Sequence, residues 1–134
     1  MRRTLLCMMA ILFLAGVAMG AGEAAQTWIK TELYFGLDIP GGGRVTQEQW
    51  ADFLDSVLTK NFPQGLTVFR AYGQMQHENG EIEKQSTRVV SLVHPADPAV
   101  NVKIQDVIKA YREKFNKPQV MRLDANVQPD FYGN

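Results

Sequence analysis

The chain has 134 residues, of which 46% are hydrophobic and 10% aromatic, and its 14 basic residues balance its 14 acidic ones. This composition excludes a disordered tail, a collagen-like repeat and a polytopic membrane protein. A formal charge of zero offers no electrostatic basis for binding nucleic acid, and the length predicts a single domain.

The first twenty residues have the pattern of a secretory signal peptide. Arg2 and Arg3 precede an uncharged apolar run over residues 5–19, which is short for a membrane span of about 20 residues. Small residues follow, and we expect cleavage near Ala21, with an alternative site near Ala25. The mature protein is then expected in the periplasm or the medium, without a stable membrane anchor.

The single cysteine lies inside this predicted signal segment, at Cys7. The mature protein is therefore expected to have no disulfide, no thiol nucleophile and no cysteine-based metal site. The two histidines, His77 and His94, form no HxH or HxxE spacing. The sequence thus predicts neither a metal site nor a cofactor.

The mature chain opens with a predicted β-strand from Thr27. Two alternating sets of side chains share it, one made of Ile29, Leu33, Phe35 and Leu37 and the other of Trp28, Lys30, Glu32 and Tyr34. This alternation is typical of a strand that buries one face. Pro40 and the three glycines after it end the strand.

A helix is predicted from Thr46, because Thr46 and Gln49 have the spacing of a capping box. Its apolar residues recur at helical spacing, at Trp50, Phe53, Leu54, Val57 and Leu58. This stripe indicates a helix buried on one side. Pro63 and Gly65 end it.

A β-hairpin follows, with strands predicted over 66–76 and 82–93. Between them lies Asn79-Gly80, the pair preferred in a type I′ turn, where both residues take positive φ.

Asp97 caps the second predicted helix, and Pro98 stands at its first position, where no backbone N–H is needed. Six apolar residues form its stripe, namely Val100, Ile104, Val107, Ile108, Tyr111 and Phe115. A last strand is predicted over 119–124, and residues 125–134 read as an irregular tail.

The element order is therefore β-α-β-β-α-β. Two helices that each bury one side, together with four strands, predict an α+β fold. The expected architecture is a two-layer sandwich of ferredoxin-like arrangement, with a four-stranded antiparallel sheet, over residues 27–124. Right-handed crossovers place the first and third strands in the middle of the sheet.

Several segments together resemble a bacterial family of exported domains of unknown function. They are Thr31-Glu32-Leu33-Tyr34-Phe35-Gly36, Trp50 with Phe53-Leu54, Phe62-Pro63-x-Gly65-Leu66-Thr67, Gly73-Gln74 and His94. The resemblance implies a small exported or lipid-anchored protein and no particular reaction. This chain lacks the lipobox of the anchored members and has Met75 where many members have an aromatic residue.

One candidate site combines a carboxylate, a phenol and guanidinium groups. Glu32 and Tyr34 share the face away from the helices, the topology places Arg122 beside the end of the first strand, and Arg88 joins them if its strand has matching parity. Such a group could bind a small anion or perform acid–base chemistry. The alternative is a cross-strand ion pair beside an aromatic residue.

Two further candidates lie at strand positions. His94 ends a central strand, where it could make a structural hydrogen bond or serve as a ligand or proton-transfer group. Gln74 follows Gly73, and a glycine inside a strand often marks a bulge or a close backbone approach. Its amide could contact a ligand or simply pack.

Two classes of function remain. The strand over 82–93 is apolar on both faces around Val89–Val93, and Trp28 and Tyr34 add to the face that no helix covers. This predicts a non-catalytic binding or assembly module that forms a homodimer through the open sheet face. The alternative is a small enzyme or ligand-binding protein with a pocket on that face, holding a small ligand.

Overall fold

The protein is described by a computed structural model that places residues 25–116 and 119–133. The predicted signal peptide falls within residues 1–24, outside the described part of the chain. Within that part, no helix is both long enough and apolar enough to cross a membrane.

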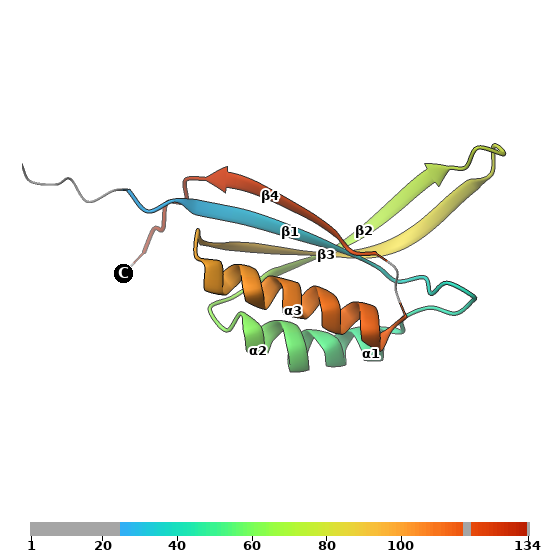
Figure 1. The fold of residues 1–134 in the computed structure, drawn as a ribbon, viewed down its shortest axis with the longest axis horizontal. Coiled ribbons are helices and arrows are strands. Elements are labelled where there is room, and N and C mark those ends of the chain that lie inside the picture. The colour runs from blue at the N-terminus through green and yellow to red at the C-terminus, as the bar shows by residue number, and fades with distance from the viewer. Residues whose placement is uncertain (1–24, 117–118, 134) are drawn as a thin grey trace, which may run out of the picture.

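Four antiparallel strands form one sheet, and the helices cover one of its two faces (Figure 1). The strands are β1 (Trp28–Gly36), β2 (Thr67–Gln76), β3 (Ile82–Pro95) and β4 (Met121–Val127), in the spatial order β2-β3-β1-β4. This arrangement confirms the α+β two-layer sandwich and the central positions of the first and third strands.

The last strand lies further along the chain than predicted, over 121–127 in place of 119–124. β4 pairs with β1 without interruption from Tyr34 opposite Met121 to Trp28 opposite Val127. The expected start of the irregular tail at residue 125 is therefore wrong. The partner strand extends to Trp28, so β4 gains backbone hydrogen bonds by continuing alongside it to Val127.

The first helix is continuous but not uniform. It consists of α1 (Gln47–Phe53), the π-helical turn η1 (Leu54–Leu58) and α2 (Thr59–Asn61). The predicted capping box is confirmed, because the Gln49 N–H donates to Thr46 Oγ1 at 3.1 Å and the Thr46 N–H donates to Gln49 Oε1 at 2.9 Å. Trp50, Phe53 and Leu58 are buried, as the stripe predicts.

The second helix, α3 (Pro98–Lys114), begins as predicted, with the Asp97 side chain accepting a hydrogen bond from the Ala99 N–H. Its buried residues include Ile104, Val107 and Tyr111. The Tyr111 hydroxyl donates to the Gly36 carbonyl oxygen at 2.7 Å and so joins α3 to the end of β1. Burial raises the pKa of Tyr111, while the charge of Arg88 opposes this rise.

The hairpin between β2 and β3 turns where predicted but not with the predicted geometry. Gly80 has a φ of +86°, whereas Asn79 is not among the described residues with positive φ, so the type I′ prediction is wrong. The Gly80 N–H donates to the His77 carbonyl oxygen at 2.9 Å, and the Glu81 N–H donates to Asn79 Oδ1 at 3.0 Å. Asn79 stabilises the turn with its side chain, and a three-residue loop with one positive-φ glycine then suffices.

Candidate functional site

The strand register divides the side chains of the sheet between two faces. Residues directly opposite one another in an antiparallel pair point the same way, and Tyr34 lies opposite Val89 on one side and Met121 on the other. Leu33 and Phe35 point to the helices and are buried, so Tyr34 and its neighbours point away from them. We call this uncovered surface of the sheet the open face.

Apolar side chains lie exposed across the open face. They come from all strands except β1 and are Phe69 (52% exposed), Met75 (56%), Val93 (49%), Met121 (46%) and Leu123 (48%). Val89 lies between Phe69 and Tyr34 in the register and is itself buried. The expectation that β3 is apolar on both faces is confirmed, with Leu92 buried under the helices and Val93 on the open face.

A pocket of about 590 Å³ hollows one end of the open face. It lies where the β2–β3 hairpin extends past the helices (Figure 1) and the chain leaves β1. The residues that line it come from all four strands and from the segments next to β1 and β4. They are Tyr34, Gly36, Asp38, Ile39, Pro40, Gly73, Met75, Glu83, Gln85, Thr87, Gln119 and Met121.

Tyr34 and Glu32 form a hydrogen-bonded pair beside this pocket. The Tyr34 hydroxyl donates to Glu32 Oε2 at 2.9 Å, and the Lys30 ammonium lies 2.6 Å from Glu32 Oε1. The hydrogen bond from Lys30, followed by the one from Tyr34, lowers the pKa of Glu32. The hydrogen bond to Glu32 in turn raises the pKa of Tyr34. Glu32 is thus held as a carboxylate and Tyr34 as a neutral phenol.

The predicted grouping of Glu32 and Tyr34 with two arginines is wrong. Arg122 lies opposite Leu33 and Arg88 opposite Phe35, so both guanidinium groups emerge on the helix-covered face. Arg122 is one residue out of phase with Met121, the open-face neighbour of Tyr34. The alternation of strand side chains therefore separates Glu32 and Tyr34 from the two arginines.

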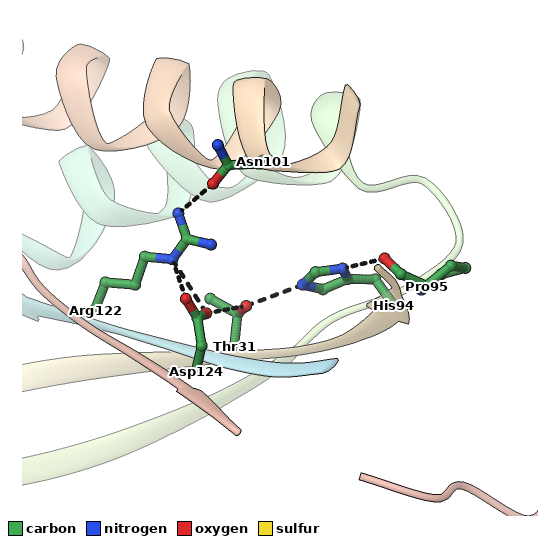
Figure 2. Close-up of polar contacts among 6 residues, drawn as sticks. All are labelled: Thr31, His94, Pro95, Asn101, Arg122 and Asp124. Atoms are coloured by element: carbon green, nitrogen blue, oxygen red, sulfur yellow. Dashed lines mark hydrogen bonds and ion pairs between the residues drawn. The ribbon is translucent and has the colours of Figure 1, made fainter. Parts of the chain in front are cut away.

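Arg122 instead joins His94 in a second polar cluster, between the sheet and the first turn of α3 (Figure 2). Thr31 Oγ1 lies 2.9 Å from His94 Nε2 and donates to Asp124 Oδ1 at 2.6 Å. Arg122 contacts both Asp124 Oδ2, at 3.0 Å, and Asn101 Oδ1, at 2.7 Å. The cluster thus connects three strands and α3.

The arrangement of this cluster indicates a structural role. Thr31 is fully buried, and its hydroxyl proton is already committed to Asp124, so it cannot serve as an accessible nucleophile. His94 Nδ1 lies 2.8 Å from the Pro95 carbonyl oxygen, an acceptor only. Both imidazole nitrogens are therefore engaged within the protein, which matches the structural alternative considered for His94.

Asp124 is the carboxylate at the centre of this cluster. Burial alone would raise the pKa of Asp124, but hydrogen bonds from Thr31 and Arg122 lower it by more. The charges of Arg122 and His94 lower the pKa further. The pKa of Asp124 consequently lies below its usual value. Sequence reasoning missed Asp124, because its buried partner Thr31 is 93 positions away along the chain.

The remaining candidates have separate positions. Trp28 contacts Phe131 with ring centroids 5.7 Å apart, at the end of the sheet away from the pocket. Gln74 lies opposite Lys84 and is exposed on the side of the hairpin away from the pocket. Its neighbour Gly73 lines the pocket instead, without a bulge, since β2 and β3 pair continuously through it.

Of the predicted site residues, only Tyr34 lines the pocket, and the lining residues that sequence reasoning missed include Gly36, Glu83, Gln85 and Thr87. Gly73, inside β2, was the available signal, because a strand interior rarely benefits from glycine. Among the residues that the structure places, no group of three histidine, cysteine or acidic side chains could hold a metal ion.

The fold is similar to those of several solved structures. A phage SAM lyase in complex with S-methyl-5′-thioadenosine has a TM-score of 0.56 at 12% identity, with 84% of this chain and 98% of the lyase chain covered. CutA from Synechococcus elongatus has a TM-score of 0.48 at 5% identity, covering 76% of this chain and 78% of the other. At these identities the likeness concerns the fold alone.

No curated protein matches the chain significantly. A family model described as "Protein of unknown function (DUF3574)" matches residues 30–131. This range includes nearly the whole described domain and every predicted site residue except Trp28. The chain therefore belongs to the DUF3574 family.

Proposed function

We propose that this domain is an exported, non-catalytic assembly module that forms a homodimer through its open face. The observation that carries the proposal is the group of five apolar side chains there, each about half exposed, around the Lys30–Glu32 ion pair on a sheet surface that no helix covers. Scattered apolar residues are ordinary on protein surfaces, but a contiguous apolar patch usually marks an interaction site.

A second copy of the chain is the occupant that the open face fits best. A two-fold axis presents the same patch twice, so a self-complementary apolar surface needs no other partner. The nine residues of β1 are about 30 Å long at about 3.3 Å per residue, and four strands are about 19 Å wide at about 4.8 Å per strand. The flat area of the sheet is therefore about 570 Å², and side chains that project from it increase the accessible surface. That size suits a standard interface, which buries about 800 Å² of accessible surface per partner.

The proposal is tested by sedimentation of the purified mature protein and of two matched variants. Val93→Lys places a charge on the open face, whereas Val102→Lys makes the same change on the exposed side of α3, at a valine of similar exposure (56% against 49%). We expect a dimer for the wild type and for Val102→Lys, and a folded monomer for Val93→Lys. A wild-type protein that sediments as a monomer at high micromolar concentration would refute the proposal.

A ligand-binding role on the same face is the second candidate, and the pocket is the observation that favours it. Its volume of about 590 Å³ lies within the usual range of about 300–1,000 Å³ for small-molecule sites. The phage SAM lyase of similar fold was solved with S-methyl-5′-thioadenosine. That ligand belongs to the lyase, and soaking or titrating it here is a direct first experiment.

A further inference from the structure

Two glycines shape the floor of the pocket, and neither is required by its backbone conformation. Gly36 and Gly73 are not among the residues with positive φ, and both lie in strands, where glycine weakens the structure. A Cβ atom at Gly36 would lie 2.7 Å from Gln85 Nε2, whereas at Gly73 the nearest atom would be the Gln85 carbonyl oxygen at 3.8 Å. Gly36 thus makes room for the Gln85 side chain, and Gly73 keeps the neighbouring volume free.

The side chain given room in this way is a carboxamide that faces the pocket. Gln85 is half-buried and lines the cavity, and no other described residue forms a hydrogen bond with its side chain. A carboxamide offers donors and an acceptor side by side. A ligand with a complementary donor–acceptor edge would satisfy both at once.

The charges around the pocket oppose an anionic ligand. Glu83 and Asp38 are its ionisable lining residues apart from Tyr34, and no lysine, arginine or histidine is among the described residues that line it. Basic side chains near these carboxylates already contact them, with His77 Nε2 at 2.9 Å from Glu83 and Arg44 Nε at 3.0 Å from Asp38. Among the described residues that line the pocket, a phosphate or carboxylate would meet like charges and no cationic side chain.

Two methionines line the pocket at its opposite edges. Met75 comes from β2 and Met121 from β4, the two edge strands. Thioether side chains adapt to flat rings and contact them favourably. The pocket therefore combines an amide-bearing floor with flexible apolar walls.

We propose that this pocket binds an uncharged planar molecule with an amide-type edge, such as a carboxamide, a lactam or a nucleobase without phosphate. The edge pairs with the Gln85 amide, and the ring lies over Gly73 beside Met75, which is two residues further along β2. This inference deepens the second candidate function and does not depend on self-association, because every residue it uses belongs to one chain.

The test is an NMR titration of the mature protein with benzamide and benzoate, which share a ring and differ in the charge of the head group. We expect benzamide to shift the backbone amides of Gly36 and Gly73 and the side-chain amide of Gln85. Benzoate should act about tenfold more weakly. Equal or stronger shifts with benzoate, or no shift at these positions with either probe, would overturn the proposal.

Two isosteric variants locate the site. Gln85→Glu replaces the amide by a carboxylate and should abolish the benzamide response, whereas Gln74→Glu makes the same change on the other side of the hairpin and should preserve it. A benzamide response that survives Gln85→Glu contradicts the assignment. Val93 lies at the far end of the sheet, so the Val93→Lys variant should still bind benzamide even if it no longer forms a dimer. Loss of benzamide binding in that variant would contradict a site contained in one chain.

Discussion

A single buried hydroxyl, that of Thr31, connects three of the four strands. It donates to Asp124 on β4 at 2.6 Å and lies 2.9 Å from His94 on β3. Because Thr31 is fully buried, losing either partner would leave polar groups unsatisfied inside the protein. The cluster thus stabilises the sheet at the end remote from the pocket.

This cluster predicts a specific pH dependence of stability. The pKa of Asp124 is lowered in the folded protein, so its contribution is present above the unfolded pKa and is lost as the pH falls through the folded pKa. Asp124→Asn should therefore reduce the free energy of unfolding at pH 7. The reduction should be less than about 1 kcal/mol, because solvent screens the ion pair between Asp124 and Arg122. The difference from wild type should shrink toward pH 3.

Urea denaturation at both pH values measures this effect. Asp106→Asn, an exposed position on α3, serves as the control and should leave stability nearly unchanged at either pH. A deficit in Asp124→Asn that stays constant between pH 7 and acid would contradict a role for the carboxylate charge.

Individual residues were the least predictable level of the site. The alternation along β1 correctly assigned Glu32 and Tyr34 to the open face, because period two follows from strand geometry. The parity of Arg122 depended on the register between β1 and β4, which a shift of one residue inverts. The pocket could not be predicted for a related reason. Its lining residues come from all four strands, so predicting it requires the register of three strand pairs at once.

At the level of elements, local sequence signals predicted most of the structure. The capping box, the Asp97 cap and the stripe on α3 are each local patterns with a direct physical cause, and all are present. The π turn over Leu54–Leu58 was not predicted, because a helical stripe with residues three and four apart fits either helix type. The longer β4 likewise depends on a partner strand and not on its own sequence.

The hairpin turn allows a prediction about backbone strain. Gly80 has a φ of +86°, a conformation that β-branched residues strongly disfavour. Gly80→Val should therefore lower the free energy of unfolding by about 1–2 kcal/mol. Glu78→Val, in the same loop but without a positive φ, should have a much smaller effect in the same urea melts. Equal midpoints for wild type and Gly80→Val would show that the turn relaxes at no cost.

At the scale of the whole molecule, composition and element order sufficed for the fold. Six elements in the order β-α-β-β-α-β, with two one-sided helices, leave few topologies once crossovers are right-handed. Composition and element order could not reveal what covers the open face, because an apolar surface can bind any apolar partner. The sheet surface that carries the proposed interface was predictable, and its occupant was not.

Export is the remaining prediction at this scale. It depends on Arg2, Arg3 and the apolar run that follows them, which lie outside the described residues. We expect the mature N-terminus between Ala21 and Gln26, in the periplasm or medium. N-terminal sequencing of the protein from each cell fraction tests this expectation, and an intact Met1 on a membrane-bound protein would contradict it.

The contact between Trp28 and Phe131 has a consequence for how the domain can be held. It brings the two ends of the described chain to the same end of the sheet (Figure 1). The pocket lies at the other end, where Tyr34 and Gly36 of β1 line it, about 20–26 Å from Trp28 at about 3.3 Å per residue. In a monomeric form of the domain, a fusion partner, a fluorescent label or a solid support attached at either terminus would therefore lie at the end of the sheet away from the pocket.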